Sequence, residues 1–179
     1  MKVAFFDRDG TINLDYPDAQ WSIISEPQLI EGSIDALKVV RDLGFEIIII
    51  TNQYIINEKY ITLEQYNFFT NLLVKLLLNN GIILLDIFYC RHARWENCQC
   101  IKPKSGMIQE ALTKYPTIDL SQSFIIGDSI VDMKLAHSLN MKGYGIKIKE
   151  KPKLPTVSYI NSIKDLVTLL EKESSQNEE

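Results

Sequence analysis

A short apolar segment, residues 3–6, ends in two aspartates one residue apart, Asp7 and Asp9, followed by Gly10 and Thr11. So short an apolar run is typical of a buried parallel strand whose carboxyl end opens into a loop. In open parallel sheets the ligand crevice lies outside these strand ends, so both carboxylates should face it. Because paired carboxylates repel each other unless a cation balances them, we expect a divalent metal, and oxygen ligands favour Mg²⁺. A solvated turn is the alternative, since Asp and Gly are common turn residues.

The size and composition of the chain favour one globular domain. It has 179 residues, 46% of them hydrophobic and 23% charged, which suits a single α/β domain with a sizeable core. The net charge of -4, with no basic stripe, argues against nucleic acid as a partner. No apolar run approaches the roughly 18 residues that span a bilayer, and no signal-peptide pattern precedes the first strand. We therefore expect a cytoplasmic protein with no membrane partner.

Strand and helix patterns alternate along the chain. Apolar runs predict strands at residues 3–6, 45–50, 82–89, 123–126 and 143–148, and helical spacing predicts helices at 33–43, 62–78, 106–115, 130–139 and 163–170. This alternation predicts an α/β fold with a doubly wound parallel sheet and helices on both faces. We expect one domain over residues 1–170, with no large cap domain, and a flexible polar tail at 171–179. Residues 14–30 either fold over the crevice or form a plain surface loop.

Polar residues follow four of the predicted strands and should meet at one rim of the sheet. They are Asp7 with Asp9, Thr51 with Asn52, Lys102, and Asp128 with Asp132. Such a set suits phosphoryl transfer, because a carboxylate can attack while a hydroxyl and a lysine position the phosphoryl group and neutralise its charge.

Three cysteines and one histidine cluster in the loop after the third predicted strand. Cys90, His92, Cys98 and Cys100 supply three thiolates and one imidazole, a closed set suited to tetrahedral Zn²⁺. With no position left open for water, such a site is structural and would stiffen the loop. The alternative is three idle cysteines and a surface histidine. His137 lies inside a helical pattern without a matching partner, which indicates a structural role.

These motifs resemble those of a known family. Asp7-Arg8-Asp9-Gly10-Thr11, Thr51-Asn52-Gln53, Lys102-Pro103 and Gly127-Asp128 through Asp132 resemble the four motifs of haloacid-dehalogenase-type phosphatases. The Cys/His loop and Lys102 through Met107 resemble the D-glycero-D-manno-heptose 1,7-bisphosphate phosphatase group, which is similar to histidinol-phosphate phosphatases. The resemblance spans residues 3–148.

The resemblance implies a haloacid-dehalogenase-type fold and a role for each motif residue. Asp7 would attack phosphorus to form an aspartyl-phosphate, and Asp9 would protonate the leaving oxygen and later activate water. The remaining implied roles are Mg²⁺ binding by Asp7, the main-chain carbonyl of Asp9 and Asp128, phosphate binding by Thr51, Asn52 and Lys102, and support of the metal site by Asp132. The implied partner is a small phosphorylated metabolite, such as D-glycero-D-manno-heptose 1,7-bisphosphate. Because no large cap insertion is visible, the site should be open, and we expect a monomer. Histidinol phosphate and a degenerate binding or regulatory module are the alternatives.

The chain departs from this group around the expected far end of a bisphosphate. The group's Ser-Gly-Ile stretch and Arg-Gly pair are replaced by residues 54–60, its Arg by Ile101 and a lysine by Ser129. Each change removes positive charge or adds bulk, and isoleucine cannot replace a bidentate arginine. Another sugar phosphate with a less charged far end is therefore also expected to fit. Lys59 and Lys104 either substitute in part or are solvated lysines.

Overall fold

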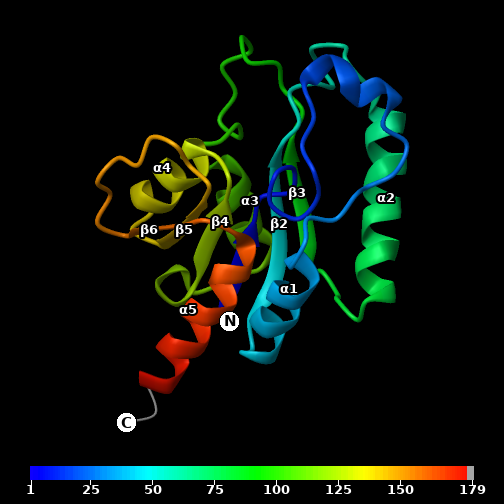
Figure 1. Cartoon of the computed structure of the whole chain (residues 1–179). Coiled ribbons are helices and arrows are strands. Elements are labelled where there is room, and N and C mark those ends of the chain that lie inside the picture. The colour runs from blue at the N-terminus through cyan, green and yellow to red at the C-terminus, as the bar shows by residue number, and fades with distance from the viewer. Residues whose placement is uncertain (177–179) are drawn as a thin grey trace.

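The computed structural model describes residues 1–176, and in it a single parallel sheet forms the centre of the molecule. Its six strands lie in the order β3-β2-β1-β4-β5-β6 (Figure 1). The strands are β1 (Val3–Phe6), β2 (Glu46–Asn52), β3 (Asp86–Cys90), β4 (Phe124–Gly127), β5 (Lys142–Ile146) and β6 (Val157–Ile160). The order reverses between β1 and β4, so the ends of these two strands flank the position where such sheets bind ligands.

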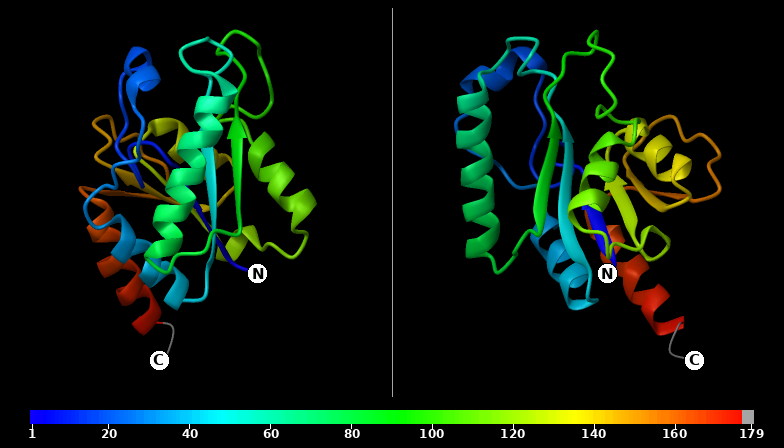
Figure 2. Two further views of the ribbon diagram at one scale, coloured as in Figure 1. Left: turned by 90° about the vertical axis from the view of Figure 1, so that its right-hand side faces the viewer. Right: turned by 180° about the vertical axis from the view of Figure 1, so that it is seen from behind.

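Helices cover both faces of the sheet, as the alternation predicted (Figure 2). They are α1 (Ser33–Asp42), α2 (Leu63–Asn79), α3 (Gly106–Lys114), α4 (Ile130–Ser138) and α5 (Ile163–Gln176), with short 3₁₀ helices η1 (Asp18–Ile23) and η2 (Leu120–Gln122). In β1, Ala4 and Phe6 pack in the cluster that contains α1 and α5, whereas Val3 and Phe5 pack against α3 and α4. This alternation buries the strand on both faces and fixes where its carboxyl end points.

Two features of the carboxyl-terminal region differ from the sequence prediction. Strand β6 was not predicted, because two of its four residues, Val157 and Tyr159, are only partly buried and Ser158 is exposed, so no continuous apolar run marks it. Pairing with β5 forms this strand. Helix α5 continues to Gln176 rather than ending at residue 170, and the rest of the predicted tail, residues 177–179, lies outside the described residues.

A third apolar cluster lies under the loops at the carboxyl edge of the sheet. It joins η1, the loop after β2 and the first half of α2 through Trp21, Ile55, Ile56, Ile61, Tyr66 and Phe69. Helix α2 begins with a capping box: the Thr62 hydroxyl accepts from the Gln65 N–H, and the Gln65 side chain accepts from the Thr62 N–H. Over residues 1–176 no insertion forms a separate cap domain, so these loops alone cover the sheet edge.

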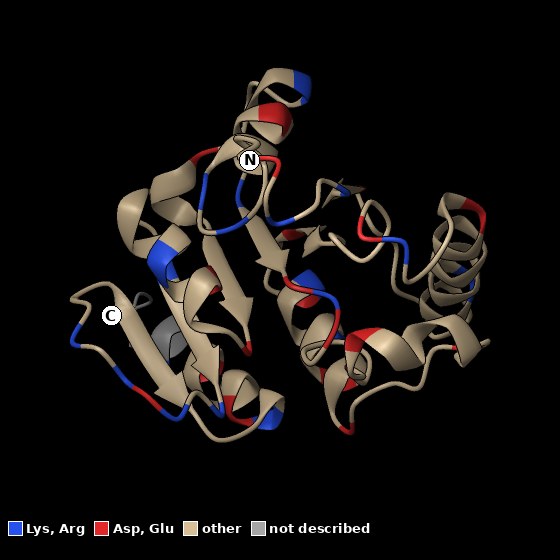
Figure 3. Ribbon diagram, turned by 90° about the horizontal axis from the view of Figure 1, so that it is seen from above, with Lys and Arg blue, Asp and Glu red and all other residues tan. Residues whose placement is uncertain are grey.

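The described helices and the charge distribution have two further features. None of the helices within residues 1–176 is both long and apolar enough to cross a bilayer. Seen from above, Lys and Arg are interspersed with Asp and Glu along the ribbon (Figure 3).

Candidate active site

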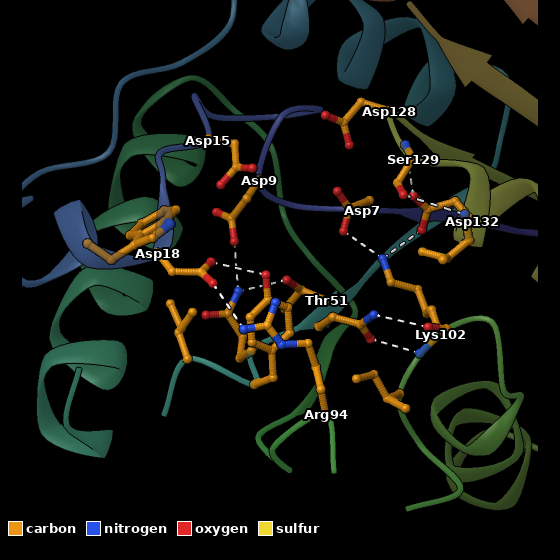
Figure 4. Close-up of a pocket in the computed structure, with 17 residues that line it drawn as sticks. Asp7, Asp9, Asp15, Asp18, Thr51, Arg94, Lys102, Asp128, Ser129 and Asp132 are labelled. Carbon is orange, nitrogen blue, oxygen red and sulfur yellow. Dashed lines mark hydrogen bonds and ion pairs between the residues drawn. The ribbon is translucent and has the colours of Figure 1, made fainter. Parts of the chain in front are cut away.

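A cavity of about 420 Å³ opens at the carboxyl ends of β1, β2 and β4. It brings together the residues that the sequence placed at the strand ends (Figure 4). These are Asp7, Asp9, Thr51, Asn52, Lys102, Asp128 and Asp132. Segments far apart in the chain therefore contribute to one site, as expected for a parallel sheet whose strand order reverses here.

Lys102 is the central cation of the site. Its Nζ lies 2.6 Å from Asp7 Oδ1 and 2.7 Å from Asp132 Oδ1, and it donates to the main-chain oxygen of Ile50 at 2.9 Å. Asn52 holds the main chain of Lys102, because Asn52 Oδ1 accepts from the Lys102 N–H at 2.8 Å and Asn52 Nδ2 donates to the Lys102 carbonyl at 3.2 Å. The structure thus places the Asn52 side chain against this loop, where it fixes the position of Lys102.

The carboxylates of the site repel one another. Burial raises the pKa of Asp7 well above its ordinary value, Lys102 lowers it, and Asp132 and Asp128 raise it further. Burial, followed by Asp132 and Asp15, raises the pKa of Asp128 to about 7. Burial alone would lower the pKa of Lys102, but Asp132 and Asp7 outweigh that effect and raise it. The single ammonium group of Lys102 cannot balance three carboxylates, so the acidic cluster keeps excess negative charge.

The acidic cluster fits a divalent cation. Carboxylate oxygens of Asp7, Asp128 and Asp132 all lie within 4.8 Å of one another, and hard oxygen ligands are those that Mg²⁺ prefers. Gly10 permits this arrangement, because a Cβ there would lie 2.0 Å from Asp128 Oδ2, and its φ of +83° also favours glycine. The Asp9 carboxylate does not belong to this cluster. Metal binding by the Asp9 main-chain carbonyl stays a prediction.

Gln53 is a site residue to which the sequence assigned no role, although it lies in one of the four motifs. Its Nε2 donates to Asp9 Oδ2 at 2.7 Å and to Thr51 Oγ1 at 2.9 Å. The Thr51 hydroxyl accepts this bond, which leaves its own hydrogen available to a ligand in the cavity. Period-two alternation at the end of β2 could have revealed the residue, because Thr51 and Gln53 point to the same side.

Residues 14–30 fold over the cavity and do not form a plain surface loop, which was the alternative for this segment. Asp15, Asp18 and Trp21 line the cavity, and the Trp21 ring packs edge-on against Phe69 of α2 at 5.3 Å between centroids. Asp18 Oδ1 accepts from the Tyr54 hydroxyl at 3.0 Å. The segment therefore forms one wall of the site.

Arg94, which was not predicted, is the second cation in the cavity lining. Its Nη2 lies 2.5 Å from Glu58 Oε2 and 3.3 Å from Asp18 Oδ2, and its guanidinium lies 4.2 Å from the centre of the Tyr54 ring. The cavity lining does not include Lys59 or Lys104. Lys104 instead donates to Cys98 O and Asn97 Oδ1. Arg94, rather than either lysine, supplies positive charge away from Lys102.

The Cys/His loop forms a second cluster beside the cavity. The ligand atoms of Cys90, His92, Cys98 and Cys100 lie within 4.8 Å of one another, and the cysteines are free thiols. His92 Nδ1 lies 3.1 Å from Cys100 Sγ, which lies 2.8 Å from Cys90 Sγ. Three sulfurs and one imidazole converging on one point have the donor chemistry of a possible Zn²⁺ site.

The His137 ring contacts Thr156, with Nδ1 lying 3.4 Å from Thr156 Oγ1. It is exposed on α4, and it does not line the cavity.

Comparisons with known proteins agree with this fold. The family model for polynucleotide kinase 3 phosphatase matches residues 2–151. The structure of D,D-heptose 1,7-bisphosphate phosphatase from B. bronchiseptica complexed with magnesium and phosphate superposes with a TM-score of 0.84 at 20% identity, covering 97% of this chain and 99% of that one. Together these observations define the class: the protein is a haloacid-dehalogenase-type phosphatase, a phosphoric monoester hydrolase.

Curated relatives narrow the class. D-glycero-beta-D-manno-heptose-1,7-bisphosphate 7-phosphatase of Haemophilus ducreyi is 34% identical over 93% of this chain and 96% of its own length. The enzyme of that name from Helicobacter pylori strain 26695 is 37% identical over 86% and 88%. The chain belongs to the D-glycero-D-manno-heptose-1,7-bisphosphate 7-phosphatase family.

Proposed function

We propose that this chain is a Mg²⁺-dependent phosphatase of a small sugar phosphate, with D-glycero-D-manno-heptose 1,7-bisphosphate as the leading substrate. The observation that carries the proposal is the cluster at the cavity floor, where Lys102 bridges Asp7 and Asp132 and Asp128 lies alongside. This arrangement places an attacking oxygen beside a fixed positive charge, which phosphoryl transfer requires. We further propose that it acts as a cytoplasmic monomer.

Asp7 is the proposed nucleophile. Its Oδ1 is engaged by Lys102, and its Oδ2 attacks phosphorus to form an aspartyl-phosphate while the bond to the leaving oxygen breaks. Asp9 gives a proton to that oxygen, then accepts one from the water that hydrolyses the intermediate. Thr51 and Lys102 bind the oxygens of the transferring group, and Asn52 acts through its hold on the Lys102 main chain.

Two metals fit the donor sets. Asp7 and Asp128, with the Asp9 carbonyl, would hold Mg²⁺, and a bound Mg²⁺ neutralises charge on the carboxylates and on the phosphoryl oxygens. Asp132 supports this site by pairing with Lys102 and by accepting from the Ser129 N–H at the start of α4. Cys90, His92, Cys98 and Cys100 would hold a structural Zn²⁺ that restrains the loop leading to Lys102.

The part of the cavity that lies away from Lys102 affects which substrate can bind. Arg94 is the cation available to a second phosphate there: its side chain is 53% exposed, although Nε and Nη2 both contact the nearly buried Glu58 carboxylate. This residue supports a bisphosphate in spite of Ile101 and Ser129. Histidinol phosphate is the second candidate, because Asp15 and Asp18 in the same lining would attract its ammonium group.

Phosphate release from heptose 1,7-bisphosphate, histidinol phosphate and several sugar monophosphates tests the proposal. Asp7→Asn should lower kcat by roughly 10³-fold or more, as loss of a covalent nucleophile does in other enzymes. Asp42→Asn, which removes an exposed carboxylate on α1, is the matched control and should retain full activity. Full activity of the Asp7 variant, or an inactive parent protein loaded with Mg²⁺, would favour a binding module instead.

A further inference from the structure

Arg8, the residue between the two motif aspartates, is almost completely buried, with 1% of its side chain exposed. Its main-chain oxygen accepts from Ile12 N at 2.9 Å and Asn13 N at 3.2 Å, which fixes the loop after β1. Neighbouring side chains on an extended chain point apart. In this loop, however, the Arg8 guanidinium turns back onto the carboxylate of its neighbour, Asp9.

The contact between these two side chains is bidentate. Arg8 Nε lies 2.8 Å from Asp9 Oδ1, and Arg8 Nη2 lies 2.8 Å from Asp9 Oδ2. Asn13 Nδ2 adds a bond to Oδ1 at 2.9 Å, and Gln53 Nε2 adds one to Oδ2 at 2.7 Å. Four N–H donors therefore hold both oxygens, and a parallel pair of charge-assisted bonds fixes the plane of a carboxylate more strictly than a single bond does.

The guanidinium itself is held from the other side by aromatic rings. Its centre lies 5.0 Å from the Phe69 ring, 5.4 Å from Tyr66 and 5.6 Å from Trp21, and Nη1 lies 3.3 Å from Thr70 Oγ1. These residues come from η1 and α2, so two elements outside the sheet fix one side chain of the catalytic loop. A buried charge with so few polar partners persists only when its one counter-ion is well placed.

We propose that Arg8 is a positioning residue for phosphoryl transfer, which fixes the Asp9 carboxylate toward the leaving oxygen through the bidentate contact. The inference rests on the proposed role of Asp9 as the proton carrier. Arg8 does not line the cavity and so does not touch the substrate. Its effect on turnover passes through Asp9, and through Gln53 this carboxylate is also linked to Thr51.

The test compares two probes that differ in their need for a proton. Glycerol 2-phosphate loses an alkoxide that must be protonated, whereas p-nitrophenyl phosphate loses a stable phenolate. Arg8→Lys keeps the charge but cannot form the bidentate contact. It should lower kcat for glycerol 2-phosphate by about 10- to 100-fold and kcat for p-nitrophenyl phosphate by only about 3-fold, with KM little changed. Arg8→Gln serves as the second variant if the lysine variant does not fold.

The same substitution is then made in an Asp9→Asn background. There Arg8→Lys should cause no further loss beyond about 2-fold, because residues that act as a unit are not additive. Ile61→Val, in the same apolar cluster, is the control: it should lower Tm and leave the ratio of the two probes unchanged.

The possible results separate the inference from the function on which it rests. An equal loss in both backgrounds would assign Arg8 to stability alone, and an equal loss with both probes would mean that Arg8 does not act on protonation of the leaving oxygen. Either result overturns the inference. If Asp9→Asn leaves the ratio of the two probes unchanged, Asp9 is not the proton carrier, and that part of the proposed function fails first.

Discussion

Removing the charge of Lys102 should destabilise the protein strongly. At an effective dielectric constant of about 20, its contacts of 2.6 Å with Asp7 and 2.7 Å with Asp132 each supply about 6 kcal/mol of attraction. Desolvation offsets much of this, but in Lys102→Met both carboxylates lose their partner, and breaking a buried pair costs about 3–5 kcal/mol. We therefore expect the free energy of unfolding to fall by about 3–5 kcal/mol in Mg²⁺-free buffer.

Lys114 provides a matched control, because its Nζ lies at the same distance, 2.6 Å, from Asp86 Oδ2. The Lys114 side chain is 57% exposed and that of Lys102 only 2%. Lys114→Met should thus cost less than about 1 kcal/mol. Adding Asp132→Asn to the Lys102 variant should recover at least about 1 kcal/mol, since it removes one unpaired buried carboxylate.

Urea denaturation, followed by circular dichroism at pH 7.5 with and without Mg²⁺, measures these differences. Mg²⁺ should reduce the loss in Lys102→Met, because a divalent ion replaces part of the missing positive charge. If Lys102→Met costs no more than Lys114→Met, or if Asp132→Asn deepens its loss, the charge balance inferred for the site is wrong.

Three further predictions test the outer half of the site and the two metals. Arg94→Gln should lower kcat/KM for a sugar bisphosphate by about 10- to 100-fold and leave kcat/KM for a monophosphate unchanged. Arg41→Gln, at an exposed arginine, is the control. An equal loss for both substrates would contradict a role of Arg94 in binding the second phosphate. Elemental analysis should find one zinc per chain, and Cys98→Ala should lose the zinc and lower Tm; a zinc-free parent protein with full activity would exclude the metal. Because the pKa of Asp128 is raised to about 7 in the folded state, the Mg²⁺-free protein should lose stability as pH rises from about 4 to 7. Mg²⁺ should therefore raise Tm more at pH 8 than at pH 5.5, and an equal rise would count against binding at Asp128.

Much of the fold was predictable because its signals are local. Strand β1, which precedes Asp7, and the middle of β2 are buried on both faces, so they appear in the sequence as continuous apolar runs. Strand β6 lies at the edge of the sheet and shows no such run, and only its pairing with β5 defines it. Helix α5 extends past its apolar stripe through Glu171 and Lys172, residue types with good helix propensity.

The site was predictable where a side chain directly follows a strand, and not where loops meet. Asp7, Thr51 and Asp128 could be placed from strand ends alone. Arg94 lies in the loop of residues 90–105, which lines the cavity, and its partners come from elsewhere in the chain: Glu58 from the loop after β2 and Asp18 from η1. No periodicity encodes such a contact.

The loop of residues 90–105 explains how cations are oriented toward the substrate although residues 1–176 form no cap domain. This loop carries both Arg94 and Lys102, and it is anchored at two places: by the Cys/His cluster and by the hydrogen bonds between Asn52 and the Lys102 main chain. At its end the Gly106 N–H donates to Gln99 O at 2.9 Å, so close that a Cβ on Gly106 would lie 2.4 Å from that oxygen. The loop is thereby packed directly onto the start of α3. A Zn²⁺ in the cluster would then act on catalysis only through the placement of Lys102 and Arg94, so its loss should weaken phosphate binding even with Asp7, Asp9 and Asp128 intact.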